Sequence, residues 1–175
     1  GIRPTGLAMY AYLPFFESTV GSFVLSHSEW RTVDPEGKPT NHLSFAYPEV
    51  RSYRVATLRE MAEQEVDGVH LTFTRGYPFV LYEKPVAESF MDKYGEDPGK
   101  LNPRDERWMR HKAAYVTQLL REIRTMLDEV GKRRGKRLGT AYHVMNSPEN
   151  SLYYSFDVAI WAKEGLVDHL IIHPC

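Results

Sequence analysis

The sequence predicts an α/β fold with parallel strands, and two observations lead to this class. Short apolar runs alternate with longer segments of helical periodicity, which is typical of βα units. No glycine-rich turn directly follows a strand, whereas long connections follow two of the strands, and this combination favours a (β/α)₈ barrel over a nucleotide-binding open sheet. A full barrel takes about 250 residues. Because this chain has 175 residues, we expect about half of a barrel, cut from a longer chain.

The first two elements are a strand and a long connection. The apolar run Leu7–Leu13 predicts a strand. The connection Pro14–Tyr47 contains the turn signal Asp34–Gly37, so we expect a loop with a small hairpin of its own. A helix begins at Pro48, because proline suits a first turn and apolar residues then recur at helical spacing.

The second strand is predicted over Asp67–Thr74. Its residues alternate, which places His70 and Thr72 on one face and the apolar residues on the other. A second long connection, Arg75–Leu101, follows and contains several prolines and glycines.

The remaining elements continue the alternation of helix and strand. A helix is expected from Asn102 to Gly131, followed by a basic cluster at 132–137 that complements the helix dipole and stays solvated. The run Leu138–Val144 predicts a third strand, Asn146–Gly165 a further helix, and Val167–Ile172 the last strand.

Composition excludes several classes of protein. Hydrophobic residues make up 42% and charged residues 26%, which is typical of a globular domain. The net charge of −1 predicts no nucleic-acid partner. No apolar run is long enough to span a membrane, so we expect no membrane span. The single cysteine, Cys175, excludes a disulfide within the chain and a four-cysteine zinc site.

Several motifs resemble those of a known family. The segments Tyr47–Arg51 and Asp67–Pro78 resemble a motif pair of the glycosyl-hydrolase-like family 10 proteins, and Phe79–Arg121 resembles a bacterial branch of that family. Trp161–Asp168 is similar to a later strand entry, so the resemblance extends from Leu7 to about His173. It implies a (β/α)₈ glycosidase-type domain that acts on or binds polysaccharide, and it favours an extracytoplasmic location.

One position departs from the family pattern. Thr72 stands where the family has its second aspartate, and a threonine cannot act as one of the two carboxyl groups that glycoside hydrolysis needs. Either other carboxylates catalyse the cleavage of O-glycosidic bonds, or the domain is a non-catalytic carbohydrate-binding or scaffold barrel.

Glu83 is the first catalytic candidate. It lies in the connection after the second strand, and aromatic neighbours there can desolvate its carboxyl group and raise its pKa toward that of a general acid. The alternative is a solvated glutamate paired with Lys84. Glu17, which follows the first strand, is the second catalytic candidate.

The candidate substrate-binding residues lie on the strands or in the connections after them. Arg75 can hold a sugar hydroxyl or a carboxylate, with an inter-strand ion pair as its alternative, and Trp108 is a candidate sugar platform. The full set is Arg75, His70, Thr72, Tyr77, Trp108, Asn146 and His173.

Four histidines on predicted strands raise the question of a metal. They are His70, His143, His169 and His173, and their spacing is poor for one ion, so we expect no metal and no cofactor. The alternative is that these histidines face inward and form hydrogen bonds with neighbouring hydroxyl groups. A metal-dependent hydrolase is the weaker alternative. Since half a barrel leaves strand edges unpaired, we expect either a homo-oligomer or the remainder of the barrel as a partner.

Overall fold

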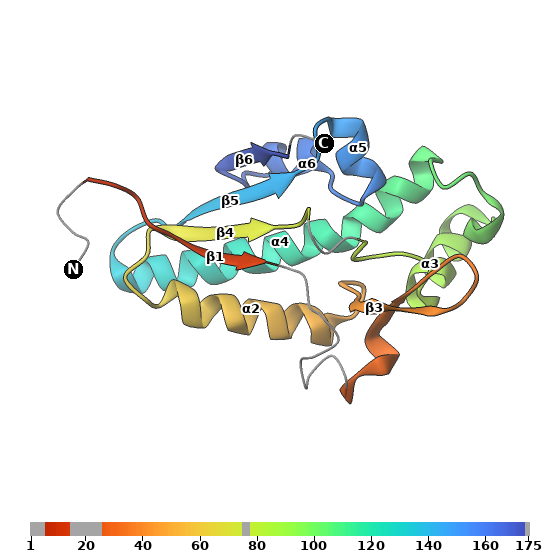
Figure 1. The fold of residues 1–175 in the computed structure, drawn as a ribbon, viewed down its shortest axis with the longest axis horizontal. Helices are drawn as coiled ribbons and strands as arrows, with labels where there is room; N and C mark the ends of the chain where they lie inside the picture. The colour runs from red at the N-terminus through yellow and green to blue at the C-terminus, as the bar shows by residue number, and fades with distance from the viewer. Residues whose placement is uncertain (1–5, 15–25, 75–77, 174–175) are drawn as a thin grey trace.

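The computed structural model describes residues 6–14, 26–74 and 78–173. Its main sheet has four parallel strands in the order β1-β4-β5-β6, which confirms the predicted α/β class (Figure 1). The four strands lie within or next to the ranges that the sequence predicts: β1 Tyr10–Pro14, β4 Gly68–Thr72, β5 Gly139–Val144 and β6 His169–Ile172.

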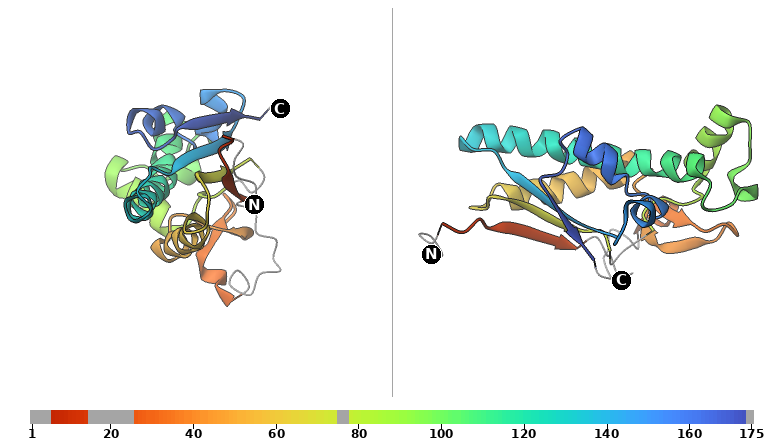
Figure 2. Two further views of the ribbon diagram at one scale, coloured as in Figure 1. Left: turned by 90° about the vertical axis from the view of Figure 1, so that its left-hand side faces the viewer. Right: turned by 90° about the horizontal axis from the view of Figure 1, so that it is seen from above.

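The two long helices pack together on one side of this sheet (Figure 2). Helix α2 spans Pro48–Ala62 and α4 spans Glu106–Arg134, and each connects one strand to the next parallel strand. Among the described helices, none is both long and apolar enough to cross a membrane.

Helix α4 differs from its predicted bounds at both ends. It begins at Glu106 because Asp105, rather than Asn102, caps it by accepting a hydrogen bond from a backbone N–H of the first turn. It also continues through Gly131, where a Cβ would lie 2.5 Å from the carbonyl oxygen of Lys136. The helix ends at Gly135, which takes the left-handed conformation with φ of 66°.

The connection Arg75–Leu101 contains a helix that the sequence analysis missed. Helix α3 spans Lys84–Tyr94 and is followed by a short 3₁₀ turn, η2, at Pro98–Lys100. Proline lies in the first turn of α3 and Gly95 ends the helix in a left-handed conformation, so both residues mark boundaries of a helix and not a loop.

The predicted helix Asn146–Gly165 is in fact two short helices, α5 (Pro148–Tyr153) and α6 (Val158–Lys163). Ser155 separates them with φ of 71°, a conformation that ends a right-handed helix. Asp157 then caps α6, its carboxylate accepting from the backbone N–H of Ile160 at 3.2 Å.

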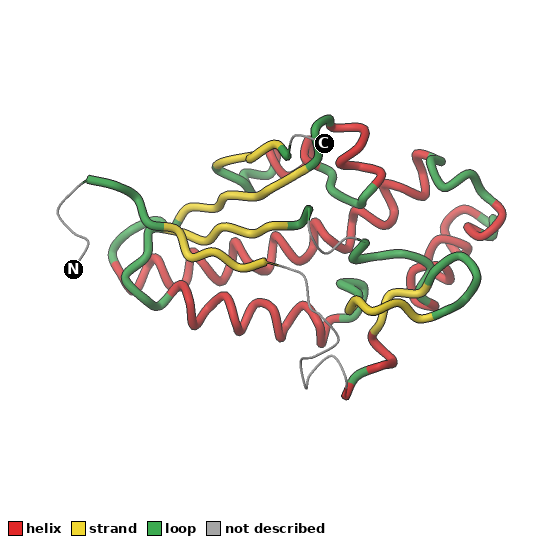
Figure 3. The backbone as a smooth tube through the Cα atoms, viewed as in Figure 1, coloured by secondary structure: helices red, strands yellow, loops and turns green. Residues whose placement is uncertain are grey.

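The predicted hairpin in the first connection is confirmed. A 3₁₀ turn, η1 (Ser28–Trp30), leads into strands β2 (Arg31–Val33) and β3 (Pro39–Leu43), which pair antiparallel (Figure 3). The segment before α3 is bound to this hairpin region, since Tyr82 N–H donates to the Val33 carbonyl and Phe45 N–H to the Phe79 carbonyl, both at 2.9 Å.

Two aspartates fix the register of the main sheet at the amino ends of its strands. Asp67 accepts a hydrogen bond from the backbone N–H of Met9 at 2.8 Å, and its own carbonyl accepts from the N–H of Gly139 at 2.8 Å. Asp168 accepts from the N–H of Thr140 at 2.8 Å. A one-residue slip would break these bonds and turn every side chain to the opposite face.

The basic cluster 132–137 supports the strand starts. Lys136 pairs with Asp67 at 2.7 Å and Arg137 with Asp168 at 2.8 Å, while Arg133 pairs with a glutamate just after α2 at 2.7 Å. The cluster therefore joins α4 to the sheet and to the end of α2 as well as lying at a helix C-terminus, where cations are favoured.

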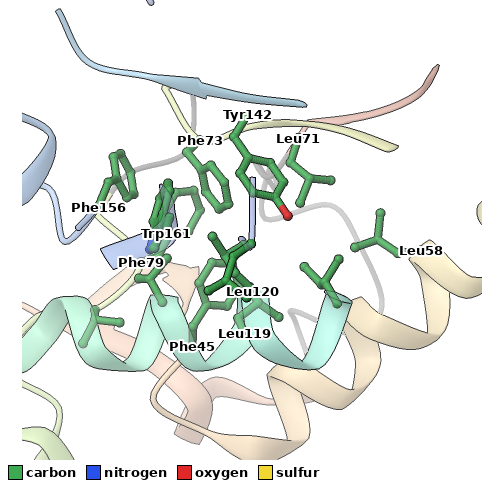
Figure 4. Close-up of a cluster of buried hydrophobic side chains, with 14 of the residues drawn as sticks. Phe45, Leu58, Leu71, Phe73, Phe79, Leu119, Leu120, Tyr142, Phe156 and Trp161 are labelled. Carbon is green, nitrogen blue, oxygen red and sulfur yellow. The ribbon is translucent and has the colours of Figure 1, made fainter. Parts of the chain in front are cut away.

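The core lies between the sheet and the helices (Figure 4). Phe73 is central to it, with its ring centroid 5.8 Å from those of both Tyr142 and Trp161. Trp161 is fully buried and its indole N–H donates to Thr117 at 3.0 Å.

Candidate functional site

The face of the sheet turned away from α2 and α4 carries the candidate site. Along β4, Val69 and Leu71 pack into the core, so the residues between and after them lie on the opposite face. The strand register places a tyrosine of β1 beside β4 and a histidine of β5 on its other side. We call these four side chains the histidine face: Tyr12, His70, Thr72 and His143.

Each side chain of the histidine face contacts the next, in the order Tyr12, His70, His143 and Thr72. The Tyr12 and His70 rings meet edge to face at a centroid distance of 5.2 Å, and His70 and His143 lie 4.8 Å apart. Thr72 Oγ1 and His143 Nδ1 form a hydrogen bond of 3.1 Å. Tyr12 is 48% exposed, whereas Thr72 is only 2% exposed. The face thus offers an accessible aromatic ring at one side and hydrogen-bonding imidazoles beside it.

The four side chains of the histidine face include no carboxylate, lysine or arginine. Burial, and secondarily the neighbouring His143, lowers the pKa of His70 below its usual value, so His70 is neutral at pH 7. The side chains at the register positions of the face are aromatic, hydroxyl, imidazole or apolar groups, without a carboxylate, lysine or arginine among those described. Such a surface suits a ligand that is uncharged and rich in hydroxyl groups.

Tyr10 closes the histidine face toward the amino ends of the strands. Its ring lies across Gly68 and Gly139, where a Cβ on either glycine would collide with it. It meets His169 of β6 edge to face at 6.1 Å. Burial, reinforced by the nearby Asp168, raises the pKa of Tyr10, so its hydroxyl stays protonated. The amino ends of the strands are therefore covered by Tyr10 on this face.

Glu83 occupies the position before the first turn of α3 and its side chain is fully buried. Burial raises the pKa of Glu83 to about 7, the direction that the sequence analysis expected. The backbone N–H of Leu81 donates to its carboxylate at 2.7 Å, and Ser44 and Lys112 lie close enough to favour the ionised form. The alternative pairing with Lys84 is wrong, since that lysine is exposed and pairs with Glu88 at 3.7 Å.

Lys112 of α4 interacts electrostatically with Glu83 and is itself 5% exposed. Burial lowers its pKa to about 8, against the opposing attraction of Glu83. Its ammonium lies 5.4 Å from the ring centroid of Trp108. The hairpin, α3 and α4 therefore enclose two ionisable groups whose charged forms are both disfavoured.

The prediction that Trp108 is a sugar platform is wrong. Its indole is fully buried, with Phe90 of α3 at 5.2 Å and Tyr82 at 5.0 Å, so it presents no face on which a sugar could stack. The sequence analysis treated α3 as part of a loop and therefore missed the helix that covers this ring.

The other candidates are dispersed or lie outside the described residues. Asn146 is exposed after β5, and its side-chain carbonyl accepts from the Asn150 amide at 2.8 Å. His173 follows β6, with its backbone N–H donating to the Val144 carbonyl at 2.9 Å. Three further candidates fall on residues that the structure does not describe: Glu17, Arg75 and Tyr77.

Metal ligation has no support from the residues that are described. Across residues 6–14, 26–74 and 78–173, no group of three His, Cys, Asp or Glu side chains is arranged to hold a metal ion. His70 and His143 adjoin each other, but their described partners are Tyr12 and the hydroxyl of Thr72 rather than a third ligand.

The sequence analysis did not pair His143 with Thr72. It expected histidines without a metal to bond to neighbouring hydroxyl groups, as His143 does, but it did not identify Thr72 as the partner. The pairing depends on the register of β5 against β4, in which Thr72 and His143 are Cα partners. Alternation within each strand gives the face of a side chain, but not which residue of the neighbouring strand lies beside it.

Two solved structures have the same fold as this chain. One is a β-galactosidase from the psychrophilic Marinomonas ef1, with a TM-score of 0.68 and 13% identity over 97% of this chain. The other is a polyextremophilic β-galactosidase from the Antarctic haloarchaeon Halorubrum lacusprofundi, with a TM-score of 0.65 and 15% identity over 95% of this chain. This chain covers 31% and 30% of their lengths. The chain therefore shares its fold with about a third of each of these two proteins.

The sequence itself gives no such match. No protein-family model matches the chain, and no curated protein matches it in sequence.

Proposed function

We propose that this chain forms the carbohydrate-binding wall of a glycoside-hydrolase-type barrel, with a sugar seated on the histidine face. The observation that carries this proposal is the face itself, where the half-exposed ring of Tyr12 adjoins the imidazoles of His70 and His143. Aromatic rings stack on the apolar faces of sugars, and neutral imidazoles both donate to and accept from hydroxyl groups. The likeness in fold to two β-galactosidases and the motif resemblance to the glycosyl-hydrolase-like family 10 proteins support the same ligand class.

Hydrolysis of an O-glycosidic bond is the activity that we assign to the barrel to which this wall belongs. Such a reaction needs a carboxyl group that is still protonated near neutral pH, together with a second carboxylate. Glu83, with a pKa of about 7, meets the first requirement, and Glu17 is our candidate for the second role. Because Glu83 is fully buried, its proton reaches a ligand only if the segment around it moves.

The second candidate function is carbohydrate binding without catalysis. It is favoured by Thr72, which places a hydroxyl where a carboxylate is expected from the family pattern, and by the enclosure of Glu83. Both functions need the histidine face, and they differ only in whether Glu83 takes part in chemistry.

Titration calorimetry with galactose and lactose tests the binding proposal. We expect Tyr12→Ala to weaken binding by at least about fivefold, the effect of losing a contact of about 1 kcal/mol. Tyr53→Ala, a change in α2 on the helix side of the sheet, is the matched control and should bind as wild type does. Absence of binding by the wild-type chain, or an equal loss in both variants, would overturn the proposal.

Turnover of a nitrophenyl β-galactoside separates the two functions. If Glu83 is the general acid, Glu83→Gln should lower turnover by about 10²- to 10⁴-fold while sugar affinity stays close to that of wild type. A protein that binds sugar and shows no turnover that depends on Glu83 is the non-catalytic binding domain, or one whose acid is another residue.

A further inference from the structure

We propose that Thr72 is a positioning residue that fixes the imidazole of His143 as a hydrogen-bonding group for the sugar. This inference rests on the proposed function, because it concerns how the histidine face recognises its ligand. Thr72 is almost fully buried, so its hydroxyl cannot be the main contact of a ligand in solution. Its side chain is instead hydrogen-bonded to Nδ1 of His143, which is partly exposed.

The Thr72 hydroxyl restricts what the His143 ring can do. A bond of 3.1 Å at Nδ1 fixes the plane of the ring and therefore the direction of Nε2. When the hydroxyl donates to Nδ1, the ring carries its proton on Nε2 and can donate it to a sugar oxygen. A carboxylate at the same position would instead favour the charged imidazolium, because an opposite charge nearby stabilises the charged form. Threonine, which carries no charge, does not favour the imidazolium in this way.

The surroundings of His143 do not favour the imidazolium either. From β4, His70 lies 4.8 Å away, so a charge on one ring opposes a charge on the other. From β1, Tyr12 contacts His70, and from β6, His169 lies at the next layer beside Tyr10. None of these described neighbours is a carboxylate, which would stabilise a charge on His143.

This arrangement predicts which sugars bind and how pH changes the choice. At neutral pH the face should bind an uncharged sugar such as galactose and should give no advantage to an acidic sugar such as galacturonate. As the pH falls and one imidazole becomes protonated, the affinity for galacturonate relative to galactose should rise by about fivefold, the effect of one unit charge at about 4 Å in water.

Nitrogen NMR of the histidine rings tests the positioning role without relying on activity or binding. We expect the His143 ring of the wild-type chain to exist as one tautomer, and Thr72→Val to mix the two tautomers. Valine has nearly the shape of threonine and keeps the β-branched packing of the strand. Thr72→Ser keeps the hydroxyl and should restore the single tautomer. A mixed tautomer in the wild-type chain would overturn the positioning role, and this measurement does not depend on the folding of any variant.

Calorimetry on the same proteins connects positioning to recognition. Galactose affinity should fall by about two- to tenfold in Thr72→Val, as expected for one lost hydrogen bond, and recover in Thr72→Ser. Unchanged affinity in Thr72→Val would overturn the role of Thr72 in recognition. If the tautomer depends on Thr72 but no sugar binds the wild-type chain, the proposed function fails while the positioning of His143 holds.

Discussion

Burial of Glu83 should reduce the stability of the folded chain above neutral pH, and removal of its charge should restore that stability. The pKa of Glu83 is raised from 4.5 to about 7, mainly by burial. Between these two values the folded protein holds a proton that the unfolded chain has released. Stability therefore falls as the pH rises from 4.5 to 7, and the loss is complete above 7. A shift of this size corresponds to about 3 kcal/mol.

Glu83→Gln tests this effect directly, because glutamine stays neutral at every pH and its amide oxygen can still accept the hydrogen bond from Leu81. We expect the variant and the wild type to have similar free energies of unfolding at pH 4.5. At pH 8 the variant should be more stable by about 2–3 kcal/mol. Urea unfolding followed by the fluorescence of the buried Trp108 and Trp161 measures both values across the pH range.

The matched control is Glu88→Gln, which changes a glutamate of the same helix whose side chain is 60% exposed. Its stability should differ from that of wild type by less than about 0.5 kcal/mol at any pH in the range. The reasoning is refuted if the wild type and Glu83→Gln keep a constant difference in stability from pH 4.5 to 8. Lys112 contributes the opposite slope, since its lowered pKa makes stability rise between about 8 and 10.5, outside the range of the test.

Three further predictions concern the sheet. Gly139→Ala should lower the free energy of unfolding in urea by about 1–3 kcal/mol, and adding Tyr10→Ala should restore part of it, because the Tyr10 side chain is what the new methyl group meets. At Gly68 a methyl group would also meet a backbone carbonyl, so adding Tyr10→Ala to Gly68→Ala should restore less. Asp168→Asn should lower the free energy of unfolding by about 1 kcal/mol at pH 7. Because Arg137 and backbone contacts lower the pKa of Asp168, the difference in stability between the variant and the wild type should disappear as the pH falls through that lowered pKa. Thermal melts from pH 7 to 2 measure this difference. Since β1 and β6 each pair with one strand only within the described sheet, we expect at least a dimer for this chain in solution, and light scattering that shows a folded 20.2 kDa monomer at micromolar concentration counts against it.

Local sequence signals predicted the elements of the main sheet because each of its strands and long helices carries its own periodic pattern. Alternation in β4 alone placed His70 and Thr72 on one face, as the structure shows. Helix α3 was missed because Pro85 and Gly95 were treated as loop residues, although they occupy the first turn and the end of a helix. Trp108 is buried because Phe90 of α3 packs against it, and no local pattern around Trp108 predicts that contact.

The chemistry of the histidine face depends on contacts that are distant in the sequence. His143 and Thr72 are 71 positions apart, and they meet because the Asp67 carbonyl accepts from Gly139 N–H at the start of both strands. The same aspartate binds the backbone of Met9 through its side chain, so it aligns β1 with β4 as well. One residue at the amino ends of the strands thus sets the order of rings and hydroxyls several residues further along. A substitution of Asp67 would remove the side-chain bond to Met9 but keep the backbone bond to Gly139, so it would disturb the alignment of β1 rather than that of β5. Because Tyr12 lies on β1, a slip of one position there would remove its ring from the histidine face.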